Sequence, residues 1–144
     1  VVFFIRLGAN IEARFNGGET PIMWAAEFGY LNIVKYLVSK GADFRAKDSN
    51  GVNSLMWAAF GKQLHVIKYL VSKGASVKTR AKNGSNSLIV AIMKRADFSL
   101  IRYLVEKGVN LNDRSKRGLT ALKAARRTGR SRIVRYLISR GAKY

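Results

Sequence analysis

The chain has 144 residues, of which 48% are apolar, 27 are Lys or Arg and only eight are Asp or Glu, so that its formal charge is +19. This composition is typical of a folded domain with a core rather than of a disordered chain, and the absence of cysteine excludes disulfides, thiolate metal sites and a cysteine nucleophile. The charge favours acidic partners such as an acidic protein surface or nucleic acid, and no apolar run has the length of a membrane span.

The first predicted element is incomplete. Residues 1–14 ("VVFFIRLGANIEAR") contain Gly8, which recurs at a spacing of 33 or 34 residues as Gly41, Gly74, Gly108 and Gly141. A second glycine series with the same spacing is Gly18, Gly51, Gly84 and Gly118. This period predicts a stack of repeated units, none of which can bury its own apolar face alone.

Four complete units follow, over residues 15–47, 48–80, 81–114 and 115–144. Each begins with a short apolar segment, such as "TPIMWAAEFG" in the first, which predicts a short helix. Thr20 and Pro21 favour a helix start there, and in the next two units we expect Ser54 and Ser87 to cap their helices. Each unit continues with a motif of the type "LNIVKYLVSKG", whose apolar spacing predicts a second helix that ends at a left-handed glycine.

The third unit departs from the others between its two helices. Gly29 and Gly129 follow the first helix in two units, but Lys62 and Arg95 replace this glycine in the other two. One extra residue also lies near Arg95–Asp97. We therefore expect an irregular turn between the helices of this unit.

Residues 17–44 ("GGETPIMWAAEFGYLNIVKYLVSKGADF") and 118–142 ("GLTALKAARRTGRSRIVRYLISRGA") resemble ankyrin repeats, and the likeness extends over essentially the whole chain. It implies an all-α repeat solenoid, in which helix-turn-helix units are joined by β-hairpin-like loops. The chain would be one domain, with a partial first unit and a C-terminal cap. Where the family usually has a His in its "TPLH" motif, this chain has Met23, Met56, Ile89 and Lys123.

The residue inventory does not predict an enzyme. The single histidine, His65, is expected on the surface, and the eight acidic residues are scattered without a repeated close pair. We therefore expect no catalytic residue, no metal and no cofactor.

Cations recur at three equivalent positions of the repeat. Those at the ends of the hairpins are Arg14, Lys47, Arg80 and Arg114. The resemblance implies that hairpins and the adjacent concave surface contact a partner, so this column is a candidate binding surface. The columns that contain Lys35 and Lys40 are expected to be structural or solvated, and the tyrosines that follow the Lys35 column to pack between units.

A second candidate lies at the end of the first helices. Phe28, Phe60 and Met93 form an apolar set that is followed towards the C-terminus by Lys94 and Arg127, a composition typical of interface hot spots. Trp24 and Trp57, one turn earlier, are expected in the core.

The leading hypothesis is a non-catalytic, monomeric module that binds an acidic protein partner, either as an adaptor or as an inhibitor or immunity-type blocker of an enzyme. One alternative is binding of nucleic acid or another polyanion by the last unit, which from Arg114 onward has eleven cations and no acid. Another is a spacer within a longer chain. A cytoplasmic location is the default, and an exported mature form is left open.

Overall fold

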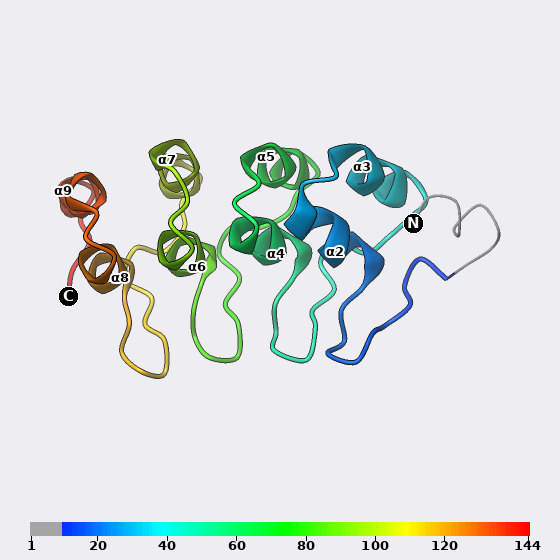
Figure 1. Cartoon of the computed structure of the whole chain (residues 1–144), viewed down its shortest axis with the longest axis horizontal. Helices are drawn as coiled ribbons and strands as arrows, with labels where there is room; N and C mark the ends of the chain where they lie inside the picture. Colours follow the sequence, from blue (N-terminus) through cyan, green and yellow to red (C-terminus); the bar gives the residue numbers. More distant parts are fainter. Residues whose placement is uncertain (1–9) are drawn as a thin grey trace.

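The structure is a computed structural model that describes residues 10–144, and within these residues it is an elongated stack of helix pairs (Figure 1). The helices are α2 (Pro21–Phe28), α3 (Leu31–Ser39), α4 (Ser54–Phe60), α5 (Leu64–Ser72), α6 (Ser87–Met93), α7 (Phe98–Glu106), α8 (Ala121–Arg127) and α9 (Ser131–Ser139). The inner row α2, α4, α6 and α8 and the outer row α3, α5, α7 and α9 form two layers, and the loops extend from one side. The predicted all-α repeat solenoid is confirmed, although residues 1–9 of the predicted partial unit, which include Gly8, lie outside the described residues.

The core lies between the two layers. Equivalent leucines of the outer helices are completely buried in every helix pair, namely Leu37, Leu70, Leu104 and Leu137. Pairs of small residues on the inner helices, such as Ala25 with Ala26 and Ala58 with Ala59, are also buried. Small side chains let neighbouring inner helices approach, so each repeat supplies the apolar surface that covers the next.

The inner helices start at caps that differ in part from the prediction. Helix α2 does begin at Pro21 after Thr20, but α4 and α6 are capped by asparagines and not by serines. Asn53 Oδ1 accepts a hydrogen bond from the Met56 N–H (3.0 Å), and Asn86 Oδ1 accepts one from the Ile89 N–H (3.0 Å). Ser54 and its equivalent are already inside the helix, where the Ser54 hydroxyl donates to the Phe44 carbonyl (2.7 Å) and ties the helix to the preceding hairpin.

The turn between α6 and α7 holds the extra residue, and it differs from the other turns as expected. Arg95 has a left-handed backbone (φ 61°), as does Lys62 (φ 60°), so both keep the conformation of the glycines they replace. Ala96 is then buried, and Asp97 accepts a hydrogen bond from the Leu100 N–H (3.1 Å) to cap α7. The extra residue thus supplies a side-chain cap that α3, α5 and α9 do not have.

The loops between helix pairs are hairpin-like, and within residues 10–144 they form only an isolated bridge between Arg80 and Asn86 and no extended strand. Successive loops are joined by single backbone hydrogen bonds, from Ser49 N–H to Gly17 O (2.9 Å), from Lys82 N–H to Asn50 O (2.9 Å) and from Lys116 N–H to Asn83 O (2.8 Å). The loops are therefore held side by side along the stack.

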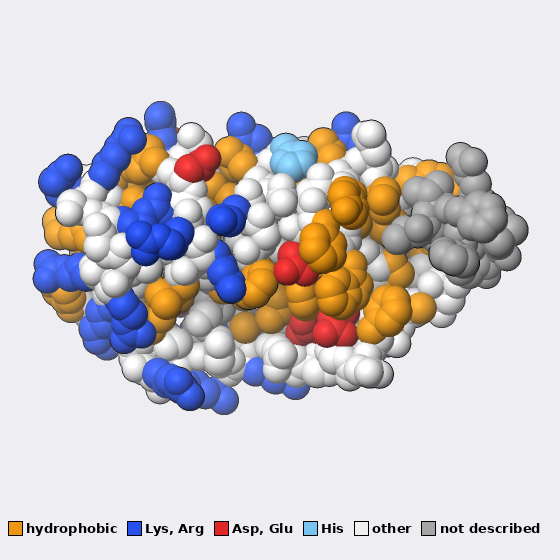
Figure 2. Space-filling view, in the orientation of Figure 1, with side chains coloured by type: hydrophobic (Ala, Val, Ile, Leu, Met, Phe, Trp, Pro, Cys, Tyr) orange, Lys and Arg blue, Asp and Glu red, His pale blue; other side chains and the backbone are white. Residues whose placement is uncertain are grey.

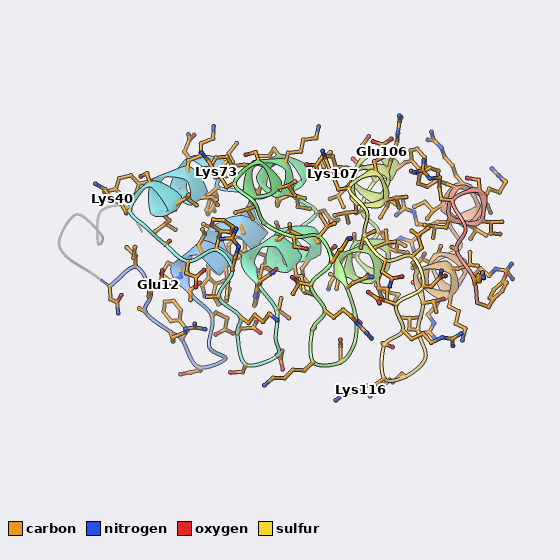
Figure 3. All side chains as sticks on the ribbon, turned by 180° about the vertical axis from the view of Figure 1, so that it is seen from behind. Glu12, Lys40, Lys73, Glu106, Lys107 and Lys116 are labelled. Carbon is orange, nitrogen blue, oxygen red and sulfur yellow. The ribbon has the colours of Figure 1, made fainter. Side chains whose placement is uncertain are left out.

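The outer helices carry the predicted cation and tyrosine columns. Lys40, Lys73 and Lys107 follow the last residues of α3, α5 and α7 and recur along the outer layer (Figure 3). Each ammonium lies 5.6 to 5.7 Å from the ring centre of the tyrosine one turn earlier. The tyrosines are half-buried between helix pairs, as expected, so these columns stabilise the outer layer.

Candidate partner-binding face

The most exposed apolar surface of the described residues is a cluster of six aromatic side chains, which we call the aromatic patch. Its members are Phe15, Trp24, Phe28, Tyr30, Trp57 and Phe60. Figure 2 shows hydrophobic side chains gathered over α2 and α4, with Lys and Arg side chains over the helices towards the C-terminus. The two kinds of side chain thus occupy opposite ends of one face.

Two tryptophans form the centre of the aromatic patch. The Trp24 and Trp57 ring centres are 5.7 Å apart, and Trp24 also stacks on Phe28 (6.1 Å, 12° between planes). Phe60 lies 6.2 Å from Trp57, so the tryptophans connect the predicted anchors Phe28 and Phe60 to each other. Aromatic pairs at these separations attract one another beyond the effect of surface burial.

The prediction that both tryptophans are core residues is wrong. Trp24 is 37% exposed and Trp57 is half-buried. The buried sides of α2 are occupied by Ile22, Met23 and the two alanines, so the indole of Trp24 falls on the remaining side of the helix. A short helix between two neighbours buries most of its circumference, and the side left over faces the hairpins.

The predicted anchors are accessible. Phe28 is 54% exposed, Phe60 41% and Met93 38%, and Arg127 is also exposed. The Lys94 ammonium lies 3.9 Å from the centre of the Phe60 ring, a close cation–π contact. The structure therefore brings Lys94 directly onto the edge of the aromatic patch, whereas Arg127 and Met93 lie further along the inner row.

Glu27 directly precedes Phe28 in α2 and is half-buried. Burial raises the pKa of its carboxyl group, and the nearby Lys94 ammonium partly opposes the rise. Desolvation disfavours the charged carboxylate, which explains the direction of the shift. Lys94 thus contacts the Phe60 ring and also partly opposes the rise in the pKa of Glu27.

The hairpin cations have structural contacts that the sequence did not reveal. Arg14 donates to its own hairpin at Gly18 O (2.9 Å) and to the next at Lys47 O (2.7 Å). Arg80 does the same at Gly84 O (3.1 Å) and Arg114 O (2.7 Å), and Arg114 donates to Tyr144 O. The arginines of this column therefore connect successive hairpins, so reversing their charge would also lower the stability of the stack.

The C-terminal cations also include structural members. Arg126 stacks on Tyr144 (4.3 Å), Arg132 stacks on Phe98 (3.9 Å), and Arg130 donates to the carbonyl of Ala96. Burial, together with repulsion from Arg95, lowers the pKa of Arg130. Exposed cations remain on this last helix pair and its hairpin, including Lys116, Arg117, Lys123, Arg127, Arg135, Arg140 and Lys143.

His65 lies at the start of α5 with an exposed side chain, and its Nε2 is 3.0 Å from the carbonyl oxygen of Gly29. Across residues 10–144, no three His, Asp or Glu side chains gather in a way that could hold a metal ion. In the same part of the chain no helix combines the length and apolar character needed to cross a membrane.

A family model described as ankyrin repeats (three copies) matches residues 1–81 and 55–144, which together span the chain. The chain therefore belongs to the ankyrin-repeat family, as its repeat pattern predicted. Members of this family are generally protein-interaction modules and are typically not catalytic. A search of curated proteins returned no match.

The sequence did not lead us to predict that four residues of the aromatic patch lie at the surface, namely Phe15, Trp24, Tyr30 and Trp57. The sequence carried no clear signal for this, because large side chains at other equivalent positions, such as Met23 and Met56, do stack in the core.

Proposed function

We propose that this protein is a non-catalytic module that binds an acidic partner protein across the face formed by the inner helices and hairpins. The observation that supports this is the segregated chemistry of that face. Exposed rings at α2 and α4 are followed by cations from Lys94 to Arg127. Aromatic anchors beside cations fit the composition of interface centres.

In this proposal the two parts of the face act in sequence. The positive field, from a chain of formal charge +19, attracts an acidic surface and raises the association rate. Phe28, Phe60 and Met93 then lose their contact with water against apolar side chains of the partner. Among the hairpin cations, Lys47 is exposed and contributes charge, while Arg14, Arg80 and Arg114 add charge and hold the hairpins in place. Such a module acts as an adaptor or as a blocker of an enzyme.

A second candidate function, binding of a polyanion such as nucleic acid, is supported by the exposed cations of the last helix pair and by the absence of acid after Arg114. The aromatic patch does not favour it, because its rings pack on one another over α2 and α4, away from that end. Base stacking would require rings interleaved with the cations.

The test is affinity capture from a source lysate at moderate salt, with and without nuclease. The proposal expects a discrete acidic protein that is retained after nuclease treatment. Loss of all bound material on nuclease treatment would favour the polyanion, and capture of nothing would leave the spacer role.

A further inference from the structure

A cavity of about 490 Å³ opens between the hairpins before α4 and α6, beside the aromatic patch. Its apolar walls are Val52, Met56, Trp57, Phe60 and Val90, and its polar rim includes Lys82. This volume is within the range of about 300–1,000 Å³ that is typical of ligand sites.

The cavity exists because a column of large side chains is interrupted. Trp24 and Trp57 occupy equivalent positions and their rings are in contact, but Val90 occupies the next position, 33 residues later. A third indole would fill part of the space that Val90 leaves. Trp57 therefore presents one side of its ring to Trp24 and the other side to the cavity.

The hairpin residue beside each of these positions also becomes smaller from the first unit to the third. Phe15 packs edge-on against Trp24 (6.4 Å), and Asp48 accepts a hydrogen bond from the Trp57 indole N–H (3.0 Å). The equivalent residue in the third hairpin is Ala81, which lines the cavity. Two side chains are thus small at the same level of the stack, and the Asp48 hydrogen bond fixes the orientation of the Trp57 wall.

We propose that this cavity receives one aromatic side chain of the acidic partner, which continues the Trp24–Trp57 column in place of the absent third ring. This inference rests on the proposed function and specifies the anchor that the partner supplies. Lys82 at the rim and Lys94 on Phe60 place positive charge next to the opening. The acidic lining residue, Asp48, is buried, and its carboxylate accepts hydrogen bonds from the Trp57 indole and from backbone N–H groups of its own hairpin. The inserted residue is therefore flanked by Asp or Glu in the partner.

The test uses two acetylated, amidated decapeptides, one with a central tryptophan between acidic residues and one with alanine in its place. Their binding to the 144-residue chain is followed by the methyl resonances of Val90 and Met56. The expected result is saturable shifts with the tryptophan peptide and at least tenfold weaker binding of the alanine peptide. Equal binding of both peptides, or binding of neither, would overturn the inference.

Val90→Trp supplies the missing ring from within the chain and should weaken binding of the tryptophan peptide at least tenfold. Asn32→Trp, which adds the same ring to the exposed surface of α3, should bind as the unmodified protein does. If Val90→Trp fails to fold, Ala81→Leu fills the cavity from the hairpin and should have the same effect. Unchanged binding by the folded cavity variant contradicts the inference.

The same variants separate this inference from the proposed function. A partner protein that is captured equally by the unmodified chain and by Val90→Trp would leave the proposed function standing and refute insertion into the cavity. Capture of no protein by the unmodified chain would instead contradict the proposed function, whatever the peptides do.

Discussion

Arg80 and Lys47 occupy equivalent hairpin positions, but of the two only Arg80 makes side-chain hydrogen bonds to the hairpins in the described part of the chain. Exchanging the two residue types therefore gives a reciprocal test of these contacts. Arg80 donates hydrogen bonds to Gly84 O and Arg114 O, and its guanidinium lies 3.8 Å from the Asp113 carboxylate. Lys47 has a single ammonium group where Arg80 has a planar guanidinium group, and this ammonium makes no hydrogen bond to the described residues. Arg80→Lys should therefore remove a connection between hairpins, and Lys47→Arg should add one.

The magnitude follows from the two carbonyl hydrogen bonds. Each contributes about 0.5–1.5 kcal/mol, and the ion pair adds little because the Arg80 side chain is 49% exposed. We expect Arg80→Lys to lower the free energy of unfolding by about 1–3 kcal/mol, which for a chain of this size lowers Tm by about 3–12 °C. Lys47→Arg should raise Tm by a smaller amount, because the surrounding loop must adjust its conformation to accommodate the new guanidinium group.

Both substitutions preserve net charge, so any effect on association by steering is excluded by design. Thermal and urea unfolding, followed by circular dichroism, measure the two effects. If Arg80→Lys leaves Tm within about 1 °C of the unmodified protein, and Lys47→Arg does not raise it, the hairpin arginines do not stabilise the stack. Their importance would then lie in charge alone.

Three further predictions concern the binding face and the helix caps. Phe60→Ala should speed dissociation of the captured partner with little change in association rate, as measured by surface plasmon resonance, and a large loss of Tm would instead place Phe60 in the core. Because folding raises the pKa of Glu27, the contribution of this residue to the free energy of unfolding should fall as the pH rises through that pKa. Lys94→Met should raise the Glu27 pKa further in an NMR titration, and an unchanged pKa would show that the Lys94 charge does not act on Glu27. Asn86→Ala should cost about 2 kcal/mol against about 1 for Asn53→Ala in urea unfolding, since Asn86 also donates to Asn110 O and Asp113 Oδ2; equal costs would argue against those bonds.

The sequence by itself determined the repeat, the helix pairs and the family. The reason is local: a glycine in the left-handed region ends each outer helix, as at Gly41 (φ 89°) and Gly74 (φ 98°), and the apolar spacing before it is helical. These signals act within one unit, so their repetition every 33 residues fixed the architecture without knowledge of contacts between units.

Only the tertiary structure decided how the units contact one another. The sequence pattern suggested that Trp24 and Trp57 are core residues. In the structure other side chains, such as Met23 and Met56, occupy the buried sides of their helices, and the two indoles pack on each other at the surface. Arg14 and Arg80 looked like free charge, yet their acceptors are carbonyls 33 and 34 residues away. Such acceptors have no sequence signal, because every residue has a carbonyl group and only the stacking of the hairpins selects the one that is reached.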